Sequence, residues 1–189
     1  MKTPDEITVI SGSYDETIAV ASIFAGILSP GDIICLNGDL GAGKTAFTTG
    51  LVKGLGFGDQ VSSPTFTILH QYCSGCGQAI RSVNHFDAYR LSGAQEFTEL
   101  GFEDITSAED AVSVIEWADR LEGMFDDTAV KICLLRREAG SGSESPGSGR
   151  MIIFSFSGRD EAARSSVFIR QLTASGISCQ VSPPIIKDP

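Results

Sequence analysis

The residues best suited to carry chemistry form one continuous loop, Gly38-Asp39-Leu40-Gly41-Ala42-Gly43-Lys44-Thr45. This loop fits the pattern G-x-x-x-x-G-K-[ST] at every fixed position, a pattern typical of loops that bind the phosphates of a nucleoside triphosphate. Glycines let the backbone wrap the phosphates closely and turn amide N–H groups toward them. Lys44 supplies a positive charge for the outer phosphates, and the Thr45 hydroxyl can ligate Mg2+. We therefore assign nucleotide binding to Gly38, Asp39, Leu40, Gly41, Ala42, Gly43, Lys44 and Thr45.

The segments on either side of this loop support that assignment. The apolar run Ile33–Leu36 directly before it is predicted to be a buried strand, and Ala46–Leu55 is predicted to be a helix. The N-terminus of such a helix carries partial positive charge and favours bound phosphate. The alternative is a glycine-rich turn with an incidental lysine, which the flanking strand and helix argue against.

Two acidic residues follow apolar runs further along the chain. Asp87 comes after Val83–Phe86, and Glu116 comes after Val112–Ile115. A magnesium–triphosphate site usually includes an acidic residue at the end of a neighbouring strand. The sequence alone does not decide which of the two holds the metal, and an acid at a strand end is often only a helix cap or turn former.

Four further residues are weaker candidates. Thr65, after Ser63-Pro64, is suited to sense the γ-phosphate, although Pro64 could merely begin a strand. His85 is expected to pack beside the sheet and not to act as a base, because nothing pairs it with a nucleophile. Arg90 and Arg120 could neutralise phosphate charge, or they could be ordinary surface arginines.

Strands and helices alternate along most of the chain. Strands are predicted at 6–11, 33–36, 80–86, 111–117, 130–135 and 151–156, and a polar loop over 61–69 is predicted to pass into another strand. Helical segments are predicted at 14–28, 46–55, 92–101, 107–110, 118–124 and 160–174. The segment 71–78 is predicted to be a hairpin turn, and the end of the chain, through Pro183-Pro184, is expected to be frayed.

Composition limits the possible functions. The 189 residues fit one domain, and a content of 42% hydrophobic and 20% charged residues is ordinary for a globular protein. The formal net charge of −10 argues against unaided binding of nucleic acid, since phosphate contact needs a basic surface. If RNA is involved, we expect a partner to carry it.

Cysteine usage and hydropathy suggest where the protein works. Five cysteines without framework spacing suggest reduced thiols in a cytosol-like compartment, so we expect a cytoplasmic protein. Cys73 and Cys76 form a single C-x-x-C, which favours a turn over a zinc site. The most apolar run, Ile18–Leu28, is too short to span a bilayer, and no targeting segment is evident. No membrane partner is therefore expected.

Four motifs in this order resemble the TsaE family, formerly YjeE, a small bacterial ATPase of tRNA threonylcarbamoyladenosine biosynthesis. The motifs are the loop 38–45, Ser63-Pro64-Thr65-Phe66, His85-Phe86-Asp87-Ala88-Tyr89-Arg90-Leu91 and Ile115-Glu116-Trp117-Ala118-Asp119-Arg120-Leu121. The resemblance covers roughly Thr8 to Gly158. Together the four motifs are far more specific than the phosphate loop alone.

The resemblance implies an α/β fold of the P-loop NTPase type, with three layers and a mixed, largely parallel central sheet. It implies ATP and Mg2+ as ligands, weak intrinsic ATPase activity, and work on the TsaD–TsaB pair, with tRNA reached only through that pair. By the same match, Lys44, Asp87 and Glu116 are the catalytic residues, and Thr45 and Glu116 are the metal ligands. Thr65 would lie on a switch-like segment and join the nucleotide-binding residues.

The resemblance also suggests a division of the chain. Residues 1–158 are expected to form a single P-loop ATPase domain, in which 138–150 is a mobile hairpin loop of Gly, Ser, Glu and Pro. Residues 159–189 are expected to form a C-terminal helix and tail. The Cys73–Cys76 turn, the loop after Glu138 and the helix after Gly158 are longer than the compact family form needs.

Two other functions remain open from the residues themselves. A small-molecule kinase would use the same loop, with Asp87 activating an acceptor hydroxyl and Arg90 holding the acceptor. A nucleotide-gated binding module would use ATP only to set its affinity for a partner.

Overall fold

The computed structural model describes residues 6–58, 60–73, 77–125, 127–137, 149–157 and 160–182. Its strands are β1 (Glu6–Ser11), β2 (Ile33–Asn37), β3 (Leu69–Cys73), β4 (Ser82–Asp87), β5 (Ala111–Glu116), β6 (Val130–Arg136), β7 (Arg150–Ser155) and β8 (Cys179–Ser182). Its α-helices are α1 (Tyr14–Ala25), α2 (Lys44–Gly54), α3 (Ala94–Glu99), α4 (Phe102–Thr106) and α5 (Glu161–Ala174). Short 3-10 helices cover Ala88–Arg90 and Ala118–Leu121.

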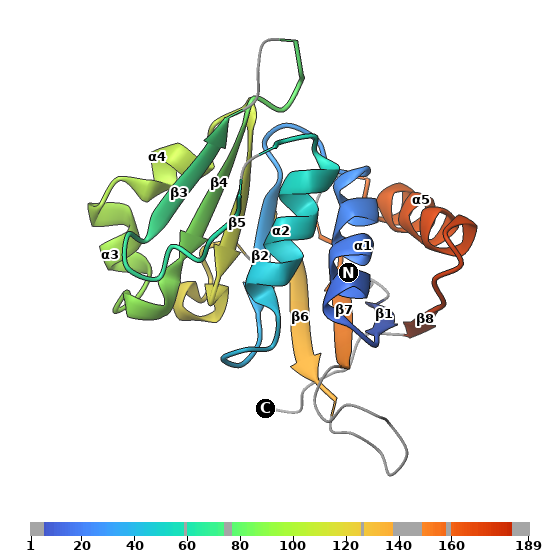
Figure 1. Cartoon of the computed structure of the whole chain (residues 1–189). Helices are drawn as coiled ribbons and strands as arrows, with labels where there is room; N and C mark the ends of the chain where they lie inside the picture. Colours follow the sequence, from blue (N-terminus) through green and yellow to red (C-terminus); the bar gives the residue numbers. More distant parts are fainter. Residues whose placement is uncertain are drawn as a thin grey trace.

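All of these strands join one mixed sheet, in the order β3-β4-β5-β2-β6-β7-β1-β8. Parallel pairing joins the four central strands β4, β5, β2 and β6, and the outer pairs on both sides are antiparallel. The phosphate loop follows β2, which is therefore flanked by parallel strands on both sides. The predicted mixed α/β fold is confirmed, with the parallel part concentrated around β2 (Figure 1).

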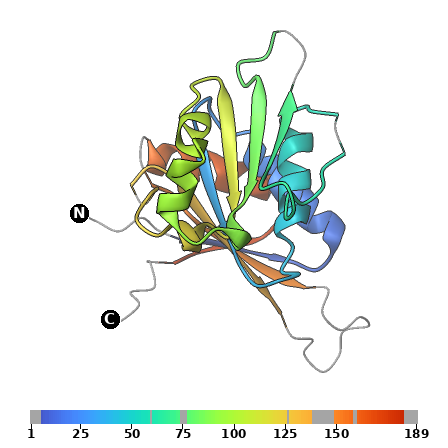
Figure 2. The same ribbon diagram turned by 90° about the vertical axis from the view of Figure 1, so that its left-hand side faces the viewer.

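Helices lie on both faces of the sheet. Helices α1, α2 and α5 cover one face, and α3 and α4 lie on the other, as the turned view makes clear (Figure 1, Figure 2). One apolar cluster lies under α1, α2 and α5 and includes Phe24, Phe47, Phe154 and Phe168. A second cluster on the other face includes Phe86, Leu91, Phe97 and Ile115. The sheet is therefore the middle of three layers where it carries the nucleotide loop.

Glycines bring α1 and α2 close together. A Cβ atom placed at Gly50 would collide with the Ile18 carbonyl oxygen, and the Ser22 hydroxyl donates to the Gly50 carbonyl at 2.9 Å. Helix α1 itself begins as its sequence predicts, because Ser13 caps it by accepting from the Glu16 N–H. This packing fixes α2, and with it the phosphate loop, against the sheet.

Several predicted elements differ from the structure. The expected helix start at 107–110 is wrong, because α4 has already ended at Thr106 and β5 begins at Ala111. A frayed end is wrong for 179–182, since Cys179–Ser182 pairs with β1 as the antiparallel strand β8. Most of the predicted hairpin loop 138–150 lies outside the described residues, as do Cys76 and residues 183–189. The four cysteines in the described part of the chain are thiols that form no disulfide there.

Candidate nucleotide-binding site

The phosphate loop connects the end of β2 to the first turn of α2. Gly38 and Gly43 have φ values of +139° and +108°, which L side chains rarely adopt. A Cβ atom at Gly38 would also collide with the Leu134 carbonyl oxygen of β6. The Ala42 N–H donates to the Asp39 carbonyl at 3.1 Å, which closes the loop on itself. The glycine spacing in the sequence is therefore required by the backbone at both ends of the loop.

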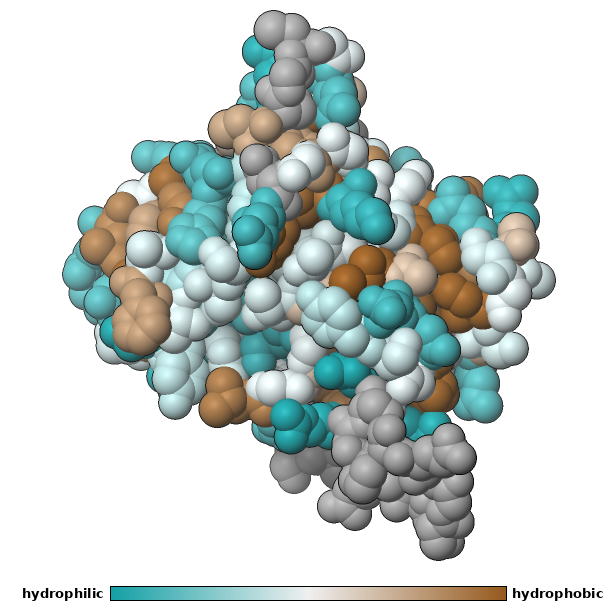
Figure 3. All heavy atoms as spheres, viewed as in Figure 1, coloured by the Kyte–Doolittle hydropathy of each residue, from teal (hydrophilic) through white to brown (hydrophobic). Residues whose placement is uncertain are grey.

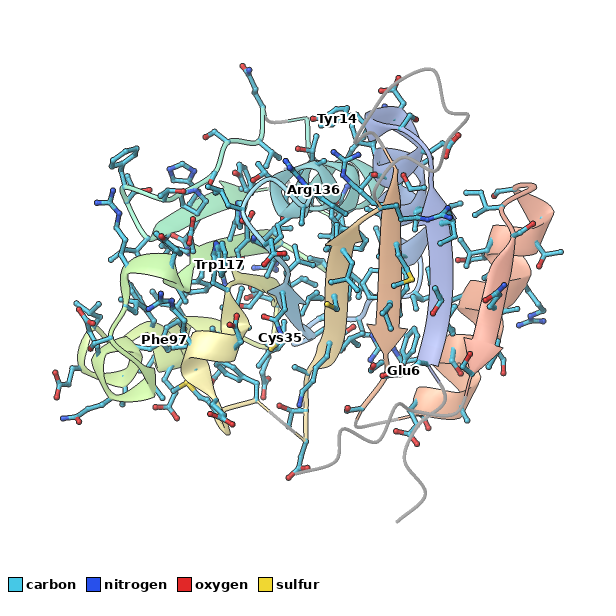
Figure 4. All side chains as sticks on the ribbon, turned by 90° about the horizontal axis from the view of Figure 1, so that it is seen from below. Glu6, Tyr14, Cys35, Phe97, Trp117 and Arg136 are labelled. Atoms are coloured by element: carbon cyan, nitrogen blue, oxygen red, sulfur yellow. The ribbon has the colours of Figure 1, made fainter. Side chains whose placement is uncertain are left out.

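Lys44 begins α2 and turns its side chain back over the loop. Its Nζ atom donates to the carbonyl oxygens of Gly38 at 2.6 Å and Asp39 at 3.0 Å. The same atom lies 3.8 Å from the centre of the Trp117 ring, within cation–π range. Viewed from below, Trp117 and Arg136 lie on the two sides of the segment that joins β2 to α2 (Figure 4).

Burial and charge act in opposite directions on Lys44. Burial holds the pKa of this amine below its usual value, because the charged form loses hydration. Surrounding carboxylates oppose that effect; in order of decreasing influence they are Glu116, Asp87, Asp119 and Asp39. The site therefore combines one buried cation with several acidic groups, an arrangement that phosphate and a divalent cation can complete.

Glu116 ends β5 next to the phosphate loop. Its register partner on β2 is Leu36, two residues before Gly38. The Thr45 hydroxyl donates to Glu116 Oε1 at 3.3 Å, and His85 Nε2 lies 2.9 Å from the same oxygen. Glu116 is almost completely buried. The structure thus brings together Thr45 and Glu116, the two residues predicted as metal ligands.

Asp87 ends β4 and is the register partner of Glu116 on the adjacent strand. One carboxylate oxygen accepts from the Thr65 hydroxyl at 2.7 Å and from the Ser63 hydroxyl at 3.3 Å. The other oxygen accepts from the Tyr89 N–H at 3.0 Å. Asp87 therefore fixes the 63–65 segment beside the loop, which places the predicted sensor Thr65 on the acidic side of the site.

The oxygen donors fit Mg2+ chemically. The Thr45 hydroxyl and the Glu116 carboxylate are hard oxygen ligands, which Mg2+ prefers, and this ion is commonly held by one or two carboxylates plus substrate phosphates. Among the described residues, no group of three or more His, Cys, Asp or Glu side chains could hold a metal ion by itself. A metal at this site would therefore need further ligands, which water or phosphate oxygens can supply.

Sequence reasoning missed three contributors to this site. Trp117 covers Lys44, and Arg136 and Arg150 donate to carbonyl groups of the phosphate loop. Trp117 directly follows Glu116, and its φ of +59° is unusual for a bulky residue, but φ is not visible in a sequence. The two arginines lie more than 90 residues beyond the loop, so only the sheet order brings them there.

Arg90 and Arg120 stack on aromatic rings. The Arg90 guanidinium lies 4.5 Å from the Phe66 ring centre, and Arg120 lies 5.2 Å from that of Tyr89. Phe66 is 83% exposed, and the ring centres of Tyr89 and Trp117 lie 5.0 Å apart. These residues form an aromatic and basic surface next to Asp87 and the 63–65 segment.

Comparison with known proteins agrees with the motifs. A family model described as threonylcarbamoyl adenosine biosynthesis protein TsaE matches residues 11–143. The chain belongs to the TsaE family. The matched range includes the phosphate loop, the 63–65 segment, Asp87 and Glu116, so the whole of the predicted site lies in the part that TsaE proteins share.

Individual relatives support the same family. The tRNA threonylcarbamoyladenosine biosynthesis protein TsaE of Bacillus subtilis is 38% identical over 122 residues, which is 65% of this chain and 73% of that protein. The protein of the same name from Treponema pallidum is 33% identical over 125 residues, 66% of this chain and 88% of that protein. The crystal structure of YdiB from Bacillus subtilis superposes with a TM-score of 0.65 at 27% identity, covering 90% of this chain and 98% of YdiB.

Within the described residues, no helix is long and apolar enough to cross a bilayer.

Proposed function

We propose that this TsaE-family chain binds ATP with Mg2+ at the phosphate loop and hydrolyses it in support of tRNA threonylcarbamoyladenosine synthesis. Its relatives carry that biosynthesis in their names. The proposed partner is the TsaD–TsaB pair, which would hold the tRNA in the cytoplasm, because a chain with a net charge of −10 is poorly suited to bind RNA directly.

The arrangement of Thr45, Glu116 and Asp87 carries the proposal. Glu116 and Asp87 are register partners on adjacent parallel strands, and the hydroxyl of the loop residue Thr45 donates to Glu116. This placement supplies two acidic groups at the C-terminal ends of strands beside the phosphate loop, where ligands of open α/β sheets bind. A structural role alone would not require two buried carboxylates at this edge.

Each residue has a distinct task in the proposed reaction. Lys44 exchanges the carbonyl oxygens of Gly38 and Asp39 for phosphate oxygens. Thr45 and Glu116 would hold Mg2+, which when bound would neutralise charge on the outer phosphates. Asp87, fixed by Thr65 beside the loop, orients the attacking water. Positioning and charge stabilisation dominate this kind of catalysis, so an incomplete site hydrolyses slowly.

A partner can complete the site through the aromatic and basic surface beside it. Thr65 and the exposed Phe66 are adjacent in sequence, and Thr65 is bonded to Asp87. A protein that binds over Phe66 would therefore contact the segment that fixes the catalytic carboxylate. Ordering of such a segment in one nucleotide state is a common switching mechanism.

Steady-state hydrolysis of ATP, alone and with a TsaD–TsaB pair, tests the proposal. We expect slow turnover alone, a clear increase with the pair, and loss of both in the Lys44→Ala variant. Retained stimulation in Lys44→Ala would refute the assignment of the loop. Phosphorylation of an added nucleoside or sugar would indicate a kinase, and nucleotide-dependent complex formation without turnover would indicate a binding module.

A further inference from the structure

Two arginines hold the phosphate loop from the side opposite the acidic residues. Arg136 ends β6 and Arg150 begins β7, and the two are register partners across that antiparallel pair. Arg136 Nε donates to the Gly41 carbonyl at 3.1 Å, and Arg150 Nε donates to the Ala42 carbonyl at 3.0 Å. Consecutive carbonyl groups of the loop are therefore each bonded to a different strand.

The guanidinium groups also lie directly on the loop glycines. A Cβ atom placed at Gly41 would collide with the guanidinium of Arg136, and one placed at Gly43 would collide with that of Arg150. Both glycines also have positive φ, at +74° and +108°. The close approach of Arg150 thus depends on Gly43, a fixed position of the phosphate-binding pattern, and that of Arg136 depends on Gly41, a variable position of the same loop.

These hydrogen bonds fix the direction of loop amide groups. A peptide unit is planar and trans, so its carbonyl oxygen and its N–H point in opposite directions. The bond from Arg150 to the Ala42 carbonyl therefore turns the Gly43 N–H away from Arg150. The bond from Arg136 to the Gly41 carbonyl likewise fixes the direction of the Ala42 N–H, which donates to the Asp39 carbonyl within the loop. Phosphate loops bind their ligand through such N–H groups, so their direction determines affinity.

The positive charges of Arg136 and Arg150 also favour phosphate binding at the loop. Four carboxylates influence Lys44 strongly enough to affect its pKa, so the acidic side of the site repels a polyphosphate. Arg136 and Arg150 place two permanent positive charges on the loop itself, since an arginine stays protonated in proteins. They offset part of that repulsion where phosphate would bind.

We infer that Arg136 and Arg150 are positioning residues that hold the phosphate loop in its nucleotide-binding conformation. The inference rests on the proposed function, because it assumes a nucleotide polyphosphate in the loop. It assigns a role in the site to Arg136 and Arg150, which lie outside all four motifs.

Affinity for ADP, measured by titration with and without Mg2+, tests the inference in Arg136→Gln, Arg150→Gln and the double variant. We expect each single change to weaken ADP binding roughly tenfold, equivalent to about 1.4 kcal/mol. The double change should weaken it further. The matched control is Arg137→Gln, which removes the same charge from an exposed neighbour whose backbone N–H bonds the Gly149 carbonyl.

A second measurement separates positioning from other roles. In the nucleotide-free protein, the amide resonances of Ala42 and Gly43 should shift in the Arg136 and Arg150 variants, with thermal unfolding close to that of the unaltered chain. An arginine that acts only by contacting the nucleotide would leave those resonances unchanged. Unchanged resonances, full ADP affinity in both variants, or an equal loss in Arg137→Gln would each overturn the inference. Absence of nucleotide binding by the unaltered chain would instead overturn the proposed function.

Discussion

His85 Nε2 lies 2.9 Å from Glu116 Oε1, and both side chains are buried. The Nδ1 atom of His85 is also buried and has no hydrogen-bond partner among the described residues. A proton on Nδ1 would therefore be unsatisfied, so we assign the neutral tautomer in which Nε2–H donates to Glu116. His85 is buried on β4, and its side chain also orients the carboxylate proposed to hold the metal.

Replacing His85 with leucine should damage both stability and the site. Among the described residues, Glu116 would keep only the long bond from Thr45, and burying a polar group without its partner costs about 1–3 kcal/mol. We expect the free energy of unfolding to fall by that amount in chemical denaturation. His85→Gln, which keeps a donor, is the matched control and should retain more stability and a higher affinity for Mg2+–ADP. Equal losses in both variants would show that packing alone matters.

Asp87 and Thr65 should affect turnover more than binding. Asp87→Asn removes the charge that is proposed to orient the attacking water, so we expect kcat to fall at least about 100-fold. Thr65→Val removes the 2.7 Å bond to that carboxylate, and a loss of roughly tenfold in kcat is expected. Affinity for ADP should change little in either variant. An unchanged kcat in Asp87→Asn would assign water orientation to Glu116.

The sequence was informative wherever the chemistry is local. The loop 38–45 needs a strand before it and a helix after it, and both are found, as β2 and α2. Asp87 and Glu116 follow apolar runs that become adjacent parallel strands, so their meeting could be anticipated from the pattern. The separate roles of Asp87 and Glu116 could not be anticipated, because they depend on which side chains surround each carboxylate.

The pairing of strands that are distant in the chain could not be predicted from the sequence. Arg136 and Arg150 reach the loop only because β6 lies beside β2 and β7 lies beside β6. The strand Cys179–Ser182 is short and mostly exposed, so its composition resembles that of a tail until β1 supplies its hydrogen bonds. The helix start expected at 107–110 is absent because α4 ends at Thr106 and β5 begins at Ala111, which leaves only four residues between them.

The pH dependence of stability should reveal the buried charge of Lys44. Burial lowers the pKa of Lys44, so between that lowered value and the ordinary value near 10.5 the unfolded chain binds more protons than the folded chain. Stability from this group therefore rises with pH across that window. We expect the unaltered, nucleotide-free protein to gain stability relative to Lys44→Met as pH rises toward 10.5, measured by urea denaturation.

A control is needed because other groups titrate in the same range. Lys53→Met removes an exposed lysine from the same helix, and comparison with it isolates the buried position. A stability difference between the unaltered chain and Lys44→Met that stays constant or shrinks with pH would contradict the argument. With nucleotide bound, the stability contribution of Lys44 should fall as pH rises, because bound phosphate favours the charged amine.

Removing residues 159–189 should unfold the rest of the chain. Helix α5 buries Phe168 completely, with ring centres 4.8 Å from Phe154 and 5.5 Å from Phe24. Apolar surface is already exposed where α5 adjoins α1 (Figure 3). Truncation would increase the area of this exposed apolar surface. Truncation would also remove β8 and leave β1, which pairs with β7 on its other side, as an exposed edge strand. We expect the truncated chain to aggregate or to lose its cooperative thermal transition.

A single substitution in α5 tests the contribution of this helix to stability without removing a segment. Phe168→Ala should lower the free energy of unfolding by about 3–5 kcal/mol, the usual cost of deleting a buried phenylalanine side chain. Val167→Ala, on the same helix but less buried, is the control and should cost much less. If Phe168→Ala and the truncated chain both unfold as the full chain does, α5 is an appendage. A large loss in both makes residues 159–182 part of the folding unit that carries the phosphate loop.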